Sequence, residues 1–160
     1  MTSILDQLAS DCLYAPDQDM WVRLDPDGHS ARIGATHLVS AHGQFMLFTP
    51  RPVGSVIERD RSLGVMETGK TAVAIHAPLS CRILEVNSAA VDNIHLVIAD
   101  PYSSGWLFRI DASHLDSERG SLVDVNAYRE WLLPRLAEKL VPPIDDFYTE
   151  DFDIDPNRGY

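Results

Sequence analysis

Cysteine and basic residues are scarce in this sequence. Only two cysteines, Cys12 and Cys81, occur among its 160 residues, too few for a fold held together by several disulfides. Lysine and arginine number 13 against 24 acidic residues, which gives a formal net charge of −11 at pH 7. Contacts to phosphate groups need clustered lysine and arginine, so the composition argues against nucleic acids and anionic membrane surfaces as partners. The protein partners that we expect present basic patches.

Long apolar runs and a basic leader are also missing. Residues 1–6 carry no basic side chain and lead into no long hydrophobic stretch. We therefore expect no signal peptide and no membrane helix, and we expect a cytoplasmic protein. No cluster of cysteine, histidine and carboxylate residues has the spacing of a metal site. The 45% hydrophobic content and the length predict one globular domain with tails.

Helical patterns occur near the two ends of the chain. Residues 1–13 form a short amphipathic segment, and Cys12 lies on its apolar stripe, so we expect this cysteine to be buried. From residue 124 to 133 apolar residues recur at intervals of three and four, and Pro134 is expected to end or kink this second helix. The chain thus divides into an N-terminal helix (1–13), a central domain (14–133) and a proline-broken tail (134–160).

The central domain consists of short apolar segments separated by glycine and proline turns. The segments that we expect to be strands are residues 20–24, 31–35, 45–48, 56–57, 63–66, 72–77 and 81–86. Residues 37–42 are expected to form one helical turn. Many short strands between turns indicate a small β-sandwich or barrel. The predicted fold class is therefore mostly β, with helices confined to the ends.

The stretch 63–78 is the most informative part of the chain. Two apolar segments meet there at a tight turn that contains Gly69 and Lys70. Alternation after the turn predicts one face with Val73, Ile75 and Ala77 and another with Ala72, Ala74 and His76. Gly69 is expected to supply the positive φ of a hairpin turn. Lys70 would then stand at an apex, which favours a modification site that the rest of the chain presents.

Residues 64–71 also match G-x-x-x-x-G-K-[ST], the phosphate-binding loop of nucleotide-binding enzymes. Residues 96–100 resemble the apolar strand ending in aspartate that would hold magnesium. This chemistry needs a buried strand before the first glycine and a helix after the lysine. Here the charged residues 58–62 come first, and a β-branched alternation stopped by Pro78 follows. A nucleotide-binding enzyme is therefore the weakest alternative.

Several short motifs between about Tyr14 and Leu132 carry a family resemblance. They are Trp21-Val22-Arg23, Ala31-Arg32-Ile33-Gly34, Pro52-Val53-Gly54, Glu67 with Lys70, Ala77-Pro78-Leu79-Ser80, Glu85-Val86-Asn87 and the run from Asp100 to Leu107. Together they resemble the H protein of the glycine cleavage system. Lys70 falls where that family carries lipoate.

The resemblance implies a barrel-sandwich hybrid of two antiparallel sheets with lipoate in amide linkage on Lys70. It implies that Glu67, Thr68, Gly69 and Thr71 form the turn that a lipoate ligase or lipoyl transferase recognises. The chain would be a carrier and not an enzyme. A rigid turn would present the lysine, and the long arm would move between partner active sites at high effective concentration.

Two departures from the family pattern bear on the pathway. Asp19-Met20 stands where the family usually has His-Glu, and Thr68-Gly69 stands where it usually has Ser-Val. With these changes the chain looks more similar to the H-protein-like lipoate-binding proteins of bacterial sulfur oxidation, which work with a heterodisulfide-reductase-like complex. The alternative is an H protein that shuttles the aminomethyl group between glycine cleavage enzymes. An unmodified binding module is the alternative from another class.

Two side chains and the tail are further candidates. His76 would touch the arm or simply be a solvated strand histidine. Cys81 would trap a lipoyl sulfur as a mixed disulfide or be inert and buried. Residues 144–160 combine six acidic residues with aromatic ones, so this tail would either be disordered or dock on the domain or in a basic groove of a partner.

Overall fold

The structure of the chain is a computed structural model that describes residues 4–37 and 44–140, with the side chains of residues 137–140 left out. Two predictions fall outside these residues. They are the helical turn at 37–42, apart from its first residue, and the behaviour of the tail at 144–160. Both stay predictions.

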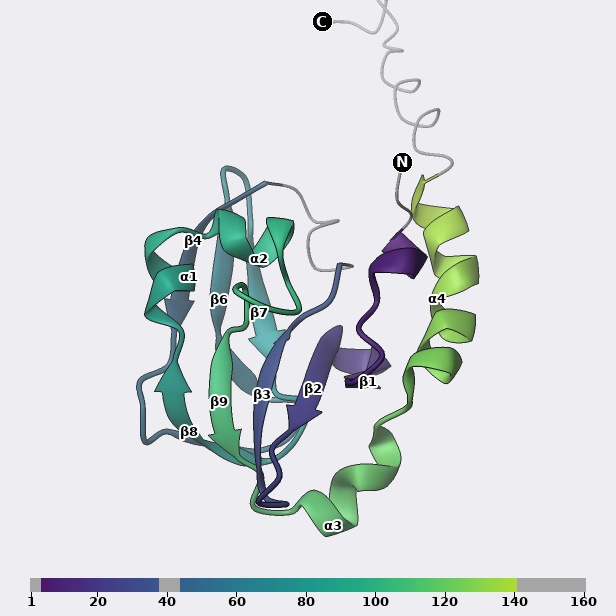
Figure 1. The fold of residues 1–160 in the computed structure, drawn as a ribbon. Helices are drawn as coiled ribbons and strands as arrows, with labels where there is room; N and C mark the ends of the chain where they lie inside the picture. Colours follow the sequence, from purple (N-terminus) through teal and green to yellow (C-terminus); the bar gives the residue numbers. More distant parts are fainter. Residues whose placement is uncertain (1–3, 38–43, 141–160) are drawn as a thin grey trace, which may run out of the picture.

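The described residues fold into two antiparallel sheets with a few short helices (Figure 1). The elements in chain order are η1 Ile4–Gln7, β1 Leu13–Ala15, η2 Pro16–Gln18, β2 Met20–Leu24, β3 Ser30–Ala35, β4 Phe45–Pro50, β5 Val56–Ile57, β6 Ser62–Thr68, β7 Ala72–His76, β8 Cys81–Val86, α1 Ser88–Asp92, α2 His95–Ala99, β9 Phe108–Asp111, α3 Leu115–Glu118, η4 Arg119–Ser121 and α4 Val125–Leu140. The larger sheet has the order β1-β2-β3-β9-β8-β5, and the smaller has the order β4-β6-β7. The predicted fold class, mostly β with two antiparallel sheets, is confirmed.

The main core lies between the two sheets because alternate residues of each strand point inward. Val22 and Ile33 come from the larger sheet and Met66 from the smaller one, and all three are fully buried. Phe48 and Phe108 meet edge to face across the core, with ring centroids 5.8 Å apart. On β2, Met20 and Val22 face this core, whereas Trp21 between them is buried on the opposite face of the sheet.

A second hydrophobic cluster covers the outer face of the larger sheet at its β1–β2 end. Helix α4 lies against this end (Figure 1), and its Tyr128 stacks on Tyr14 with ring centroids 4.4 Å apart. Trp21 is fully buried in the same cluster, and its indole crosses β3 at Gly34. A Cβ on Gly34 would lie 2.6 Å from the indole ring. The glycine is therefore required by the close approach of the ring.

The helices differ from the prediction at both ends and in the middle. The N-terminal helix is only the 3-10 turn Ile4–Gln7, because Leu13–Ala15 pairs with β2 as a strand. Three short helices, α1, α2 and α3, interrupt the second half of the domain, so helices are not confined to the ends. Helix α4 continues through Pro134 to Leu140. Leu132 and Leu136, on either side of the proline, both pack in the second cluster and hold the helix together there.

Within residues 4–37 and 44–140, no helix has the length and apolar character needed to cross a membrane. In the same residues no three histidine, cysteine or carboxylate side chains come together as a metal site would require.

Candidate functional site

The β6–β7 hairpin ends in a tight turn at residues 69–71. Antiparallel pairing brings Glu67 opposite Ala72, and the turn stands at the upper end of the smaller sheet in Figure 1. Lys70 is exposed at its tip, and Glu67, Gly69 and Thr71 are exposed around it. The predicted alternation on β7 is confirmed, since Ile75 and Ala77 are buried and Ala72, Ala74 and His76 are exposed. All five residues predicted for the site therefore lie together.

The turn is fixed by Thr68. Its backbone N–H donates to the carbonyl oxygen of Thr71 at 2.8 Å and so closes the hairpin. Its Oγ1 accepts hydrogen bonds from the backbone N–H groups of Lys70 and Thr71, both at 3.1 Å. These bonds satisfy the two amides that face into the turn, as a Ser/Thr turn does. The backbone of Lys70 is thus held in place while its side chain extends into solvent.

Gly69 does not have the predicted positive φ. The described glycines with positive φ are Gly28, Gly54 and Gly64. A Cβ on Gly69 would lie 3.8 Å from the sulfur of Met46, which is ordinary van der Waals contact. The prediction was wrong because Thr68, and not a left-handed glycine, supplies the turn.

Strand β4 places an apolar surface beside the turn. Residues 45–48 were predicted to be a buried strand, but only Phe45 and Phe48 are buried, whereas Met46 is 67% and Leu47 49% exposed. A β-bulge between Phe45 and Leu47 sets Met46 outside the regular pairing with β6. The sequence gives no alternation that would have revealed this bulge. Met46 and Leu47 are the residues near Lys70 that sequence reasoning missed.

A pocket of about 250 Å³ lies along the other edge of the hairpin. It is lined by residues 73–76 of β7 and by residues 17–20, which include the end of η2 and the start of β2. Asp19 and Met20, which stand where the family usually has His-Glu, therefore line this pocket. Met20 is fully buried, so of the two residues Asp19 is the one that can meet a partner.

The other two candidate side chains lie away from the tip. His76 pairs with Ser62 at the base of the hairpin, and its Nδ1 lies 2.9 Å from the carbonyl oxygen of Asp60. Cys81 is 1% exposed on β8, and burial raises the pKa of its thiol to about 12. At neutral pH this thiol is protonated and shielded from solvent. The burial of Cys81 therefore favours an inert cysteine over one that forms a mixed disulfide with a lipoyl sulfur.

The phosphate-loop match is contradicted by the structure. Strand β7 follows Lys70, where the motif needs a helix whose N-terminus would bind phosphate. Residues 95–99 form helix α2, not the strand that would precede a magnesium-binding aspartate. The carboxylate of Asp100 instead accepts hydrogen bonds from the backbone and hydroxyl of Ser104.

The comparisons with known proteins agree on one family. A sequence model described as "Glycine cleavage H-protein" matches residues 13–134. Glycine cleavage system H protein 5 of Aquifex aeolicus is 32% identical over 136 residues, covering 83% of this chain and 92% of that protein. The H protein of Escherichia coli O7:K1 is 34% identical over 129 residues, covering 80% of this chain and 98% of that protein.

A solved structure agrees with the sequence matches. The crystal structure of a glycine cleavage system H protein from Mycobacterium marinum superimposes with a TM-score of 0.67 at 28% identity, covering 78% of this chain and 98% of that one. None of these matches supports the expected closer likeness to the lipoate-binding proteins of sulfur oxidation. The chain belongs to the glycine cleavage H-protein family, whose members are carriers, not enzymes, and hold lipoate covalently on a lysine.

Proposed function

We propose that this protein is a lipoyl carrier of the glycine cleavage system, with lipoate attached to Lys70. The observation that carries the proposal is the exposed lysine at the tip of a hairpin whose turn is fixed by Thr68. The chain has two lysines, Lys70 and Lys139, and only Lys70 lies on a hairpin. An acylating enzyme needs such an accessible amine on a backbone of defined shape.

The carrier role follows from the chemistry of the arm. An amide to the lysine removes the ammonium charge and adds a long, largely apolar chain that ends in a dithiolane. Tethering that group gives it a high effective concentration at each partner active site in turn. The protein would receive lipoate from a lipoate ligase or lipoyl transferase. It would then carry the aminomethyl group between glycine cleavage enzymes.

The surroundings of Lys70 fit partner contact. Met46 and Leu47 offer apolar surface on one side of the turn, and the pocket at residues 17–20 and 73–76 lies on the other. Exposed apolar residues next to a functional group mark interaction surfaces more often than scattered ones do. Both features border the hairpin, where an enzyme acting on the arm has to bind.

Reconstitution tests the pathway. The lipoylated protein is mixed with glycine decarboxylase, and exchange of labelled bicarbonate into the carboxyl group of glycine is measured. We expect exchange with the wild-type protein and with Lys139→Arg, and none with Lys70→Arg.

The H protein of Escherichia coli serves as the positive control. If that protein supports exchange and the lipoylated protein does not, glycine cleavage is rejected while the carrier proposal stands. Exchange with unmodified protein would reject the lipoyl carrier itself. The departures at residues 19–20 and 68–69 make this a necessary test.

A further inference from the structure

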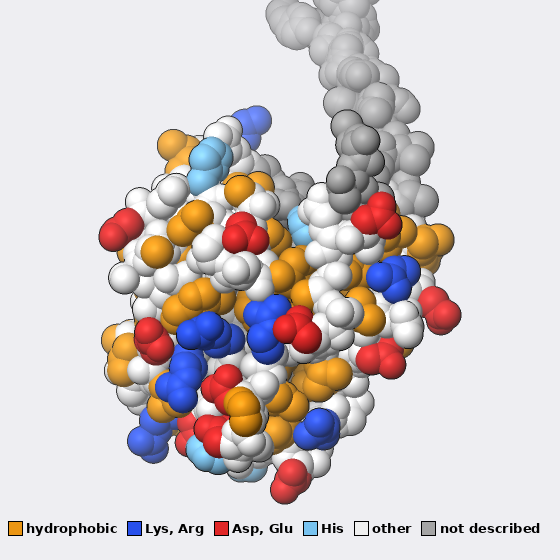
Figure 2. Space-filling view, in the orientation of Figure 1, with side chains coloured by type: hydrophobic (Ala, Val, Ile, Leu, Met, Phe, Trp, Pro, Cys, Tyr) orange, Lys and Arg blue, Asp and Glu red, His pale blue; other side chains and the backbone are white. Residues whose placement is uncertain are grey.

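The outer face of the larger sheet is covered only in part by described elements. Helix α4 and the N-terminal segment pack on its β1–β2 end through Tyr14, Trp21 and Tyr128. Over β3, β9 and β8 the same face carries exposed or half-buried polar side chains. Figure 2 shows Lys and Arg side chains gathered in the middle of this view, with Asp and Glu side chains among and beside them. A face with this charge is unexpected in a chain of net charge −11.

The strand register aligns arginines across this face. Arg23 on β2 is paired with Arg32 on β3, and Arg32 is paired in turn with Arg109 on β9. On β8, Arg82 is paired with Asp111 and the exposed Glu85 is paired with Arg109, so two carboxylates also lie on this face. Like charges directly opposite each other destabilise a sheet. Three aligned arginines therefore need anions nearby to offset their repulsion.

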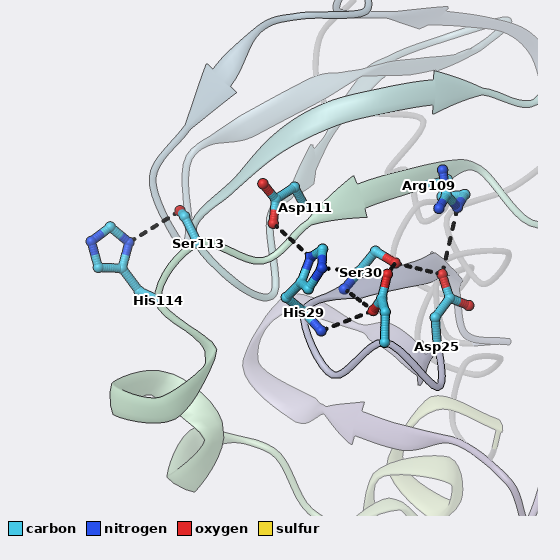
Figure 3. A network of polar contacts seen from close by, with 8 residues as sticks. Asp25, His29, Ser30, Arg109, Asp111, Ser113 and His114 are labelled. Atoms are coloured by element: carbon cyan, nitrogen blue, oxygen red, sulfur yellow. Dashed lines mark hydrogen bonds and ion pairs between the residues drawn. The ribbon is translucent and has the colours of Figure 1, made fainter.

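The described anions neutralise two of these arginines and leave two without an ion pair. Arg23 forms an ion pair with Asp11 at 2.9 Å. Arg109 lies 3.5 Å from Asp25, and Figure 3 marks this contact by a dashed line. Arg32 and Arg82 are exposed and form no ion pair with any residue in the described ranges. The guanidinium of Arg32 lies 4.9 Å above the ring of Trp106. We call Arg32, Arg82, Arg109 and Trp106 the arginine face.

The chain itself contains a segment of matching chemistry. Helix α4 covers the adjoining part of the same face and ends at Leu140, after which 20 residues follow. An extended chain of that length spans about 60 Å, well beyond the size of a domain of this length. In residues 151–155 acidic and apolar residues alternate, with Asp151, Asp153 and Asp155 separated by Phe152 and Ile154. An extended segment would present carboxylates on one side and apolar groups on the other.

We propose that residues 144–160 bind intramolecularly to the arginine face. Carboxylates of the segment pair with Arg32 and Arg82, and an aromatic ring packs beside Trp106. Each exposed ion pair is weak by itself, but the tether supplies a high effective concentration and several pairs act together. The segment would supply carboxylates to Arg32 and Arg82, which have no ion pair within the described residues. This binding does not depend on whether Lys70 carries lipoate.

A spin label on the segment tests the contact in the full chain. Asn157→Cys supplies a single accessible thiol, because Cys12 and Cys81 are 3% and 1% exposed. With a nitroxide at residue 157, we expect loss of amide signal intensity at Arg32, Arg82 and Arg109 in nitrogen-15 spectra. The signals should recover in Arg32→Gln/Arg82→Gln, and also at 1 M salt, where the Debye length shrinks to about 3 Å.

A matched variant and a mixing experiment decide the outcome. Arg59→Gln/Arg61→Gln removes the same charge from exposed positions between β5 and β6 and should leave the signal loss intact. Full intensity at the arginine face, or equal loss in both double variants, would overturn the proposal. An equal loss in a mixture of spin-labelled nitrogen-14 chains with nitrogen-15 chains that carry no spin label would also overturn it, in favour of a contact between two copies.

Discussion

Thr68 has the role at the hairpin turn that the sequence assigned to Gly69. Its hydroxyl oxygen accepts from the two amides that follow it in the turn, Lys70 and Thr71. A left-handed glycine is therefore unnecessary there. Residue types alone do not distinguish the two solutions, since threonine and glycine are both turn residues. The pattern predicted which residue stands at the apex but not which neighbour holds it.

Thr68→Val should weaken the turn because valine keeps the shape but removes the acceptor. We expect the free energy of unfolding to fall by about 1 kcal/mol, the usual value of a hydrogen bond, and lipoylation of Lys70 to slow. Urea denaturation and a lipoylation time course measure the two effects. Thr68→Ser keeps the acceptor, so equal behaviour of the two variants would show that the hydroxyl is not needed.

Gly34→Ala should be far more damaging than Gly69→Ala. The new methyl group at Gly34 would lie 2.6 Å from the buried indole of Trp21, whereas at Gly69 the nearest neighbour is 3.8 Å away. Overpacking of this kind costs about 1–3 kcal/mol. Gly69→Ala should be neutral or stabilising by a few tenths of a kcal/mol, through the unfolded chain. Denaturation midpoints compare the two, and a Gly69 variant as unstable as the Gly34 variant would contradict this description of the turn.

At the scale of elements, periodicity predicted the strands well and the short helices poorly. Strands such as β7 alternate over several residues, so their two-residue period is visible. Helices α1 and α2 have five residues each, too few for a 3.6-residue period to emerge, and the apolar run at 96–99 also fits a strand. Asn87 is the one residue type that could have indicated the start of α1, since asparagine favours the N-cap position. Its side-chain oxygen accepts a hydrogen bond from the backbone N–H of Ala89. Of the two effects expected from Pro134, an end to the helix is contradicted, since α4 continues to Leu140 and packs against the second cluster on both sides of the proline.

Leu132 and Leu133 test how α4 is held on the sheet. The two leucines are adjacent, yet Leu132 is 1% exposed in the second cluster and Leu133 is 52% exposed. Leu132→Ala should lower the free energy of unfolding by about 2–5 kcal/mol, whereas Leu133→Ala should change it by less than about 0.5 kcal/mol. Thermal and urea denaturation of both variants measure this difference. Equal losses would mean that α4 does not pack as described.

At the scale of the whole molecule, ionised aspartates connect stability to pH. Hydrogen bonds from Ser30 to Asp27, from Arg23 to Asp11 and from Ser104 to Asp100 hold the pKa of each carboxyl below its usual range. The unfolded chain takes up these protons near pH 4, whereas the folded chain keeps the groups ionised to lower pH. Below about pH 4 the unfolded state therefore binds more protons, and stability is lost as the pH falls further.

Asp27→Asn should flatten this loss. The variant no longer titrates at the position where Asp27 accepts hydrogen bonds from Ser30 and His29 in the β2–β3 turn. We expect a shallower fall of the melting temperature between pH 4 and pH 2 than in the wild type. Asp116→Asn is the matched control, since Asp116 is exposed and no described hydrogen bond or ion pair involves it. If the melting temperature of Asp116→Asn falls as little as that of Asp27→Asn, the lowered pKa of Asp27 is not the cause of the acid sensitivity.

The proposed carrier function requires lipoate on Lys70. The most direct measurement is the intact mass, with peptide mapping, of protein produced together with an active lipoate ligase. We predict one lipoyl group on the peptide that contains Lys70 in the wild type and in Lys139→Arg, and none in Lys70→Arg. An unmodified Lys70 in cells that lipoylate a co-produced Escherichia coli H protein would contradict the account.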